Sequence, residues 1–394
     1  MQFKAQRGAL TSLIFVSGDR RHFDDSSYSF LRSLREASIY RVVDMQEGFG
    51  LVGAEVPTKC QNCATLSELH FVSYQPSLYP IPFNRYPVTN LSVLSVQGPF
   101  SAESSGIPLA LFDLITNNVA LTSLSLDVAW TSGAQHFSRL ADNLPSLFFS
   151  SLRHLRLPRW HVDISSAWIK MMPSLTSLDV TPPSPGTDHS TLWTVLREEN
   201  VHLKDLSVTV VTQELISYLK SYSGLHSLVL TDVESDRFLS EQLYTQVIPK
   251  HAEMLVSLTV DGRNNDEWCL EAGHASVFRS CGKLKDLSVV IKAEALSDIK
   301  TLMSSIPLSL RTLCLTWNTS DPDVEYLRSF IFRLYDSDLE SRPLNQSLII
   351  YADIVYLLGR VDEGKSGFVF RGFKTHRSQL NWAAARSLCG SSKT

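Results

Sequence analysis

Catalytic signatures and long apolar runs are both missing from this sequence of 394 residues. No stretch approaches the roughly 18 apolar residues that a membrane-spanning helix needs. The charged start, Met1–Arg7, has no apolar run behind it that would predict a signal peptide. Gly-x-Ser-x-Gly, His-Glu-x-x-His and calcium-loop patterns do not occur either. We therefore expect a protein that neither catalyses a reaction nor inserts into a membrane.

Cysteine is sparse, and its spacing predicts no disulfide framework. The six cysteines are scattered along the chain, which favours a reducing compartment, the cytoplasm or the nucleus. Cys60 and Cys63 have the local spacing of a zinc site, but no second Cys or His pair lies at a usable distance. Because a structural zinc ion needs four ligands, we expect neither a metal nor another cofactor.

Positive charge is scarce over most of the chain. Residues 360–394 hold seven Lys and Arg against two acidic residues, a net charge of +5, whereas the whole chain carries −4. Residues 1–359 therefore carry −9. Phosphate backbones are bound by clustered Lys and Arg, so the acidic body argues against nucleic acid as the main ligand.

What the sequence does have is one six-residue pattern, Leu-x-x-Leu-x-(Leu/Val/Phe), in eleven copies. They begin at Leu10, Leu66, Leu91, Leu121, Leu152, Leu175, Leu203, Leu225, Leu255, Leu284 and Leu310. A degenerate copy, Leu34–Ile39, fills the longest gap, and the mean spacing of the twelve is then about 27 residues. This period is typical of leucine-rich repeats, each of which pairs a strand with a helix.

The pattern predicts an α/β fold: a leucine-rich-repeat solenoid, or horseshoe, with parallel strands on its concave face and helices on its convex face. In Leu203–Val208, alternation points Leu206 and Val208 inward and Asp205 and Ser207 outward. Between strands, residues such as Leu215, Ile216, Leu219 and Tyr222 have helical spacing. We expect a solenoid of about 12–13 irregular repeats over residues 1–350. A basic C-terminal cap with a β-hairpin and a short helix would follow over 351–394.

The chain resembles the leucine-rich halves of F-box proteins, particularly those of fungi. The resemblance rests on irregular repeats of the Leu-Thr-Ser-Leu type, as at Leu10, Leu121 and Leu175, and on Trp residues near strand ends. In that family, an F-box before the repeats binds a ubiquitin-ligase adaptor, and the repeats select the substrate. No F-box is recognisable here. The resemblance implies a substrate-recognition half, with an adaptor as partner only if an F-box lies upstream. The alternative is a stand-alone scaffold or inhibitor unconnected with ubiquitin.

Candidate partner-binding residues are those on the outward strand positions. Most are acidic or hydroxylated, so we expect a groove that receives a basic segment of a protein partner; the alternative is a merely solvated sheet face. Tryptophans just past three strands are further candidates, or else they pack in the rim. The candidate set is Glu68, Asp127, His154, Arg156, Asp179, Asp205, Asp261, Asp286, Trp130, Trp160 and Trp317.

One motif suggests a different function. Gly359–Ser366 matches the phosphate-loop pattern Gly-x4-Gly-Lys-Ser, which binds nucleotide phosphates when it links a strand to a helix. Here the following residues, Gly367–Gly372, have the composition of a strand, and Asp362 and Glu363 would place negative charge beside the phosphates. We predict a β-hairpin that turns at Asp362–Lys365. Nucleotide binding remains a distant alternative.

Overall fold

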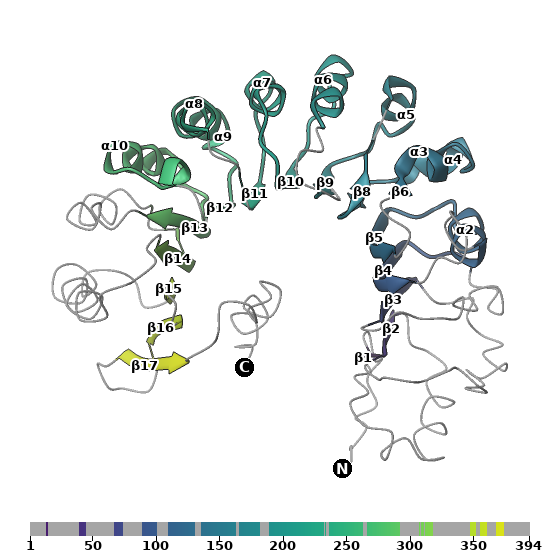
Figure 1. The fold of residues 1–394 in the computed structure, drawn as a ribbon, viewed down its shortest axis with the longest axis horizontal. Coiled ribbons are helices and arrows are strands. Elements are labelled where there is room, and N and C mark those ends of the chain that lie inside the picture. Colours follow the sequence, from purple (N-terminus) through teal and green to yellow (C-terminus); the bar gives the residue numbers. More distant parts are fainter. Residues whose placement is uncertain are drawn as a thin grey trace, which may run out of the picture. The chain divides into compact units, whose positions relative to one another are not determined.

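A computed structural model describes the following residues: 13–14, 39–44, 67–73, 89–100, 109–130, 135–162, 165–181, 189–231, 233, 236–262, 266–291, 307, 309–310, 312–317, 347–351, 355–360 and 368–373. The chain forms two compact units, residues 1–203 and 204–394. The described helices follow strands between β4 and β13, and in each unit they lie on one side of the strands (Figure 1). None of the described helices combines the length and apolar character needed to cross a lipid bilayer.

The first unit has a parallel sheet in the order β1-β2-β3-β4-β5-β7-β9 and a two-stranded ribbon, β6-β8. The strands of the sheet are β1 (Leu13–Ile14), β2 (Ile39–Asp44), β3 (Glu68–Ser73), β4 (Val93–Phe100), β5 (Ser123–Trp130), β7 (His154–Arg156) and β9 (Ser177–Val180); the ribbon is β6 (Gln135–His136) and β8 (Trp160–His161). The helices are α2 (Leu109–Thr116), α3 (Phe137–Ala141), α4 (Ser146–Ser151), α5 (Ser166–Met171) and α6 (Ser190–Glu198).

The second unit has its strands in the order β10 to β17, parallel from β10 to β15 and antiparallel from β15 to β17. They are β10 (Asp205–Val208), β11 (Ser227–Thr231), β12 (Ser257–Asp261), β13 (Asp286–Ile291), β14 (Thr312–Trp317), β15 (Ser347–Tyr351), β16 (Val355–Arg360) and β17 (Phe368–Phe373). The helical segments are α7 (Gln213–Ser221), α8 (Arg237–Gln242), the π-helix η4 (Leu243–Val247), α9 (Ile248–His251), the 3-10 helix η5 (Asp266–Trp268), α10 (Ala272–Ala275) and the 3-10 helix η6 (Ser276–Ser280).

Sheet register follows the sequence repeat. The second leucine of each motif pairs with the second leucine of the next, as in Leu206↔Leu228↔Leu258↔Leu287↔Leu313. All three apolar residues of the motif are buried in each of the eight copies that begin between Leu91 and Leu284. Because a one-residue slip would turn each strand's leucines to the opposite face, burial fixes this register. The predicted α/β class with parallel strands and inward leucines is confirmed.

A second regularity joins consecutive repeats just before each strand. The carbonyl oxygen of the residue after the first leucine accepts two N–H groups from the next repeat. The Thr122 oxygen, for example, accepts from the Arg153 and His154 nitrogens at 2.8 and 3.0 Å. The Lys204 oxygen does the same for His226 and Ser227, at 2.7 and 3.0 Å. These bonds satisfy backbone groups that would otherwise be unpaired where the chain turns into the strand.

Helices form because each buries one apolar face against the strands. In α7, Leu215, Ile216, Tyr218 and Leu219 are buried, as helical spacing predicts, and Tyr222 is buried where the helix ends. Thr212 caps its start, because its hydroxyl oxygen accepts the Leu215 N–H at 3.3 Å. Asp236 caps α8 through Leu239 in the same way at 3.0 Å.

Two buried polar side chains complete the backbone hydrogen bonding at the first leucine of a repeat. The Asn118 Oδ1 atom accepts the Leu91 N–H at 2.8 Å, and its Nδ2 atom donates to the Leu114 oxygen at 2.7 Å. In the second unit, the His251 Nδ1 atom accepts the Leu225 N–H at 3.2 Å. The amide of Asn118 and the imidazole of His251 thus have the same role in two repeats, which is to accept the backbone N–H of the first leucine.

The degenerate copy predicted at Leu34–Ile39 is wrong by three residues. Strand β2 begins at Ile39, and Tyr40 pairs with Leu69, the second leucine of the next motif. The repeat in that gap is therefore Ala37–Val42. The physical reason lies in local propensity: Ile39, Val42 and Val43 favour a strand, whereas the residues from Leu34 to Ala37 are good helix formers.

Candidate protein-binding face

The strand face, defined as the third and fifth motif positions, points away from the buried leucines. In the first unit the third positions align Glu68, Val93, Ser123, His154 and Ser177 across β3 to β9. The fifth positions align His70, Ser95, Ser125, Arg156 and Asp179. These rows hold serines and charged or histidine side chains, with Val93 as the one apolar residue, and all of them keep some exposure to solvent.

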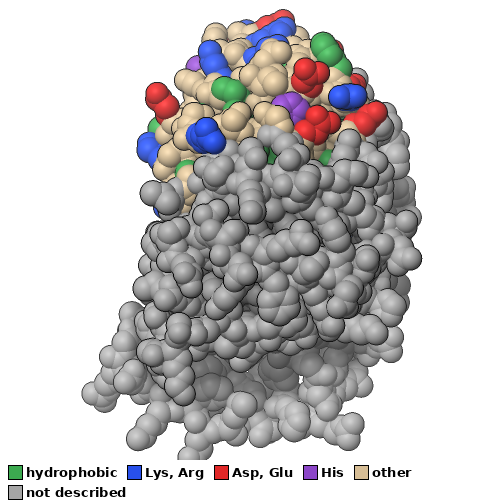
Figure 2. Space-filling model, turned by 90° about the vertical axis from the view of Figure 1, so that its left-hand side faces the viewer, with side chains coloured by type: hydrophobic (Ala, Val, Ile, Leu, Met, Phe, Trp, Pro, Cys, Tyr) green, Lys and Arg blue, Asp and Glu red, His purple; other side chains and the backbone are tan. Residues whose placement is uncertain are grey.

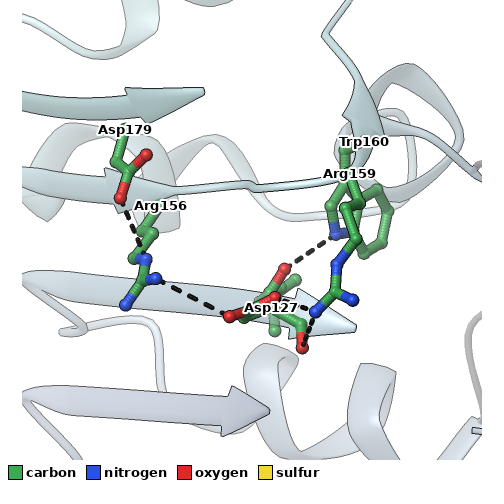
Figure 3. A network of polar contacts seen from close by, with 6 residues as sticks. Asp127, Arg156, Arg159, Trp160 and Asp179 are labelled. Atoms are coloured by element: carbon green, nitrogen blue, oxygen red, sulfur yellow. Dashed lines mark hydrogen bonds and ion pairs between the residues drawn. The ribbon is translucent and has the colours of Figure 1, made fainter. Parts of the chain in front are cut away.

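Charges gather at the edge of this face, around Asp127, which lies one residue past its motif and is only 9% exposed. Arg156, on β7, lies between two predicted acidic residues on neighbouring strands (Figure 3). Its Nε atom is 3.0 Å from an Asp179 oxygen, and its Nη2 atom is 3.6 Å from an Asp127 oxygen. The Arg156 side chain is nevertheless half exposed. It therefore binds both carboxylates and still offers part of its guanidinium group to solvent.

Arg159 is the functional candidate that sequence reasoning missed. It forms an ion pair with Asp127 from the side opposite Arg156 (Figure 3). Its backbone has φ of 69°, a left-handed conformation that is costly for a side chain of this size. Its backbone N–H donates to the Thr181 carbonyl oxygen at 2.7 Å, so its backbone and its guanidinium group each have a partner. Nothing in the local sequence Pro158-Arg159-Trp160 predicts this partner.

This cluster of four charges, Asp127, Arg156, Arg159 and Asp179, bears on the expected acidic, hydroxyl-lined groove, whose candidate residues already included Arg156. Two carboxylates and two guanidinium groups balance to a net charge of zero. Each of the two predicted acidic residues in this cluster is therefore paired within the chain. A basic segment of a partner would have to displace an arginine in order to reach either of them.

The remaining candidates of the first unit lie along the same face. Glu68 and His70 on β3 are 3.5 Å apart and partly exposed. His154, at the start of β7, is exposed. Their strands, β3 and β7, flank β4 and β5, which carry Ser95, Ser123 and Ser125.

The second unit keeps the predicted acidic character in one row. Its third positions align Asp205, Ser227, Ser257, Asp286 and Thr312 across β10 to β14. Asp286 is exposed and Asp205 is half-buried. No ion pair to either aspartate occurs among the residues that the structure describes. The carboxylates of Asp205 and Asp286 thus face solvent, and Ser227 and Ser257 lie between them on β11 and β12.

Asp261 departs from this row. It is only 3% exposed at the end of β12, so it offers no surface to a partner. It lies one residue past the last motif position and pairs with Thr231 on β11, which stays partly exposed.

Trp160 is likewise removed from the accessible surface. Its side chain is fully buried, and its Nε1 atom donates to the Leu126 oxygen at 2.9 Å (Figure 3). It packs in the rim, which was the alternative to a binding role. Trp130 and Trp317 end β5 and β14, and their side chains lie outside the described residues.

The phosphate-loop pattern begins inside β16 and is followed by β17, which pairs antiparallel with it through Arg360↔Phe368. A phosphate loop instead leads from a strand into a helix, whose N-terminus faces the phosphates. Residues 361–367 lie outside the described part of the chain, as do Cys60 and Cys63. Among the described residues, no group of three or more His, Cys, Asp or Glu is placed to hold a metal ion.

Charges of both signs are interspersed over the described surface in the space-filling view (Figure 2). The large hydrophobic side chains that stand out from the described surface are isolated ones, Leu147 on α4 and Phe238 on α8. Single exposed hydrophobic residues are normal in folded proteins. The polar strand face is therefore a better candidate for recognition than the helical surface.

No protein-family model matches the chain, and no curated protein matches it either. Its interpretation therefore depends on the repeat pattern and on the geometry of the strand face.

Proposed function

We propose that this chain is a leucine-rich-repeat solenoid that binds a protein partner along its strand face and catalyses no reaction itself. The observation that carries the proposal is the register. Equivalent motif positions pair strand after strand, so one face of each sheet is packed leucine, and the other carries mostly polar side chains, interrupted by Val93 and Val229. Stacked repeats build extended binding surfaces of this kind.

The partner that best fits the second unit is a segment with basic side chains. The carboxylates of Asp205 and Asp286 lie in one row, separated by Ser227 and Ser257. Neighbouring strands are about 4.8 Å apart, so three strand spacings place the two carboxylates about 14 Å from each other. An extended peptide covers that span with about four residues. Complementary charge would steer such a segment to the face and reject acidic competitors.

The narrower proposal is that the chain is the substrate-recognition part of an F-box-type ubiquitin-ligase receptor. Its support is the resemblance of the repeats to the leucine-rich halves of that family. In this arrangement the adaptor would bind an F-box upstream of the repeats, and the strand face would hold the substrate.

The test is affinity purification of the full-length gene product with matched pairs of substitutions. Ser125→Arg and Ser207→Arg place a bulky cation on the strand faces of the two units. Ser150→Arg and Ser221→Arg place the same side chain on exposed positions of α4 and α7. We expect the first pair to lose the co-purifying partner and the second pair to keep it, with all four melting like the wild type.

Partner loss from the helix pair instead of the strand pair would refute the strand-face proposal. The F-box proposal has its own readout in the same experiment. A ubiquitin-ligase adaptor should co-purify with all four variants, because it would bind outside the repeats. A strand-face partner without any adaptor would favour the stand-alone scaffold.

A further inference from the structure

Thr181 follows the last residue of β9 and precedes a proline. Of the seventeen prolines in the chain, only Pro182 and Pro185 follow a serine or threonine, and both lie in the segment Thr181-Pro182-Pro183-Ser184-Pro185. A following proline restricts a residue to extended backbone. Thr181 is thus an extended hydroxyl residue with a proline directly after it, which is the substrate chemistry of proline-directed protein kinases.

The hydroxyl group of Thr181 has no hydrogen-bonding role among the described residues. Its side chain is half-buried, and no hydrogen bond to its hydroxyl occurs within the part of the chain that the structure describes. Alternation along the strand places Thr181 on the same face as Asp179, two residues earlier. A group added to the hydroxyl oxygen would therefore project from the strand face rather than into the leucine core.

Two guanidinium groups lie next to this position. The Thr181 carbonyl accepts the Arg159 N–H at 2.7 Å, which places the two residues side by side at the ends of adjacent strands. Arg156 contacts Asp179 at 3.0 Å. The side chains of both arginines are about half exposed, 46% for Arg159 and 50% for Arg156. Each can thus reorient without unpacking the core.

We propose that Thr181 is a phosphorylation site for a proline-directed protein kinase, and that Arg159 and Arg156 bind the phosphate in competition with Asp127 and Asp179. In the reaction, the Thr181 hydroxyl oxygen attacks the γ-phosphorus of ATP. The new O–P bond forms as the bond to the β-phosphate oxygen breaks and ADP leaves. The hydroxyl proton passes to the base of the kinase. The site stands whether or not the strand face binds a partner.

Electrostatics explains why the modification would act as a switch. The four-charge cluster has a net charge of zero, and a phosphate adds about −1.5 to −2 at pH 7. Guanidinium–phosphate pairs with two parallel hydrogen bonds are stronger than single ones, so an arginine that leaves Asp127 gains a better partner. Phosphorylation therefore converts a neutral patch beside Ser125 and Ser177 into an acidic one.

The first experiment uses the folded full-length chain with a purified proline-directed kinase and ATP. Wild type, Thr181→Ala and Ser184→Ala are compared, and the phosphorylated residue is located by mass spectrometry. We expect phosphate on Thr181 in the wild type and in Ser184→Ala, and loss of that phosphopeptide in Thr181→Ala. Phosphate confined to Ser184, or no incorporation, would overturn the site.

The second experiment tests capture by the arginines. Phosphorylated Ser184→Ala gives a single phosphothreonine, whose second pKa is read from a 31P NMR titration. A free phosphate titrates at about 6; bound by guanidinium groups, it should titrate lower by about one pH unit or more. Arg159→Asn, which tolerates the left-handed backbone, should move the value back toward 6. Arg197→Asn on α6, an exposed control, should leave it low. A value at or above 6 in phosphorylated Ser184→Ala that carries both arginines would refute the capture.

Discussion

His251 makes the stability of the second unit depend on pH in a way that can be calculated. Its ring is buried between two repeats, where the Nδ1 atom accepts the Leu225 N–H at 3.2 Å and the Nε2 atom lies 2.9 Å from the Leu219 oxygen. These partners require a neutral imidazole with its proton on Nε2. Protonation would place a second N–H against the Leu225 N–H and break that bond. Tyr222 packs edge-on against the ring at 5.1 Å between centroids.

Burial lowers the pKa of His251 from 6.5 to about 4, opposed by the hydrogen bond to Leu219 and aided by Lys250. The unfolded chain therefore takes up the proton first as the pH falls. The stability that the neutral ring contributes is fully present above about pH 6.5 and is lost between there and pH 4. One pKa unit corresponds to about 1.4 kcal/mol, so linkage predicts a loss of about 2 kcal/mol at pH 5.

The assay is urea denaturation of wild type and His251→Asn at pH 7 and pH 5. Asparagine serves the equivalent position at Asn118 and does not titrate, so it removes the pH term while retaining the hydrogen-bonding capacity. Between the two pH values, the wild type should lose about 2 kcal/mol more than the variant. His202→Gln, an exposed histidine of the first unit, controls for general histidine effects. Equal losses in wild type and His251→Asn would refute the reasoning.

Four other substitutions or additions have defined outcomes. Asn118→Leu leaves two buried backbone groups without a hydrogen-bond partner, so it should lower the free energy of unfolding by about 2–5 kcal/mol in urea denaturation. A loss below about 1 kcal/mol would mean that another group replaces the asparagine. Leu206→Asp should cost about 4 kcal/mol, because it buries a carboxylate among leucines, whereas the neighbouring Ser207→Asp should stay within about 0.5 kcal/mol. If Leu206→Asp and Ser207→Asp lowered stability equally, the assignment of inward and outward positions in β10 would be wrong. Asp127→Asn weakens two partly exposed ion pairs and should cost about 1 kcal/mol, most of it removable by salt; a salt-independent loss would contradict the ion-pair account. Finally, ATP should leave the melting temperature unchanged in wild type and in Lys365→Ala, and a shift seen only in the wild type would revive nucleotide binding.

Much of the fold could be predicted because the repeat carries its own register. Leucines at fixed motif positions determine which residues are buried, and burial then determines which strand positions pair. The helix that follows Thr212 was equally predictable, since its apolar spacing and its capping residue agree. The error at Leu34–Ile39 shows the limit of the pattern. Where leucine is replaced, as by Tyr40, β-branched neighbours locate the strand better than the spacing does.

The strand face was predictable in outline but not in its charge state. Alternation correctly placed Asp205 and Asp286 toward solvent. It could not foresee that Asp127 would meet two arginines, because Arg159 reaches it only through a left-handed residue after β7. Asp261 is buried at the end of β12, and Trp160 is buried in the separate ribbon formed by β6 and β8, so both lie beyond the six motif positions. These contacts depend on tertiary structure, and a six-residue pattern carries no information about them.

The measurement that tests the central proposal most directly is site-specific photo-cross-linking in cells that express the full-length gene product. A photoreactive amino acid is placed singly at Ser125 or Ser207 on the strand face, and at Arg197 or Glu241 on exposed positions of α6 and α8. Recognition along the strand face predicts a discrete protein adduct from Ser125 or Ser207 and none from the helix positions. Adducts from Arg197 or Glu241 alone would contradict it.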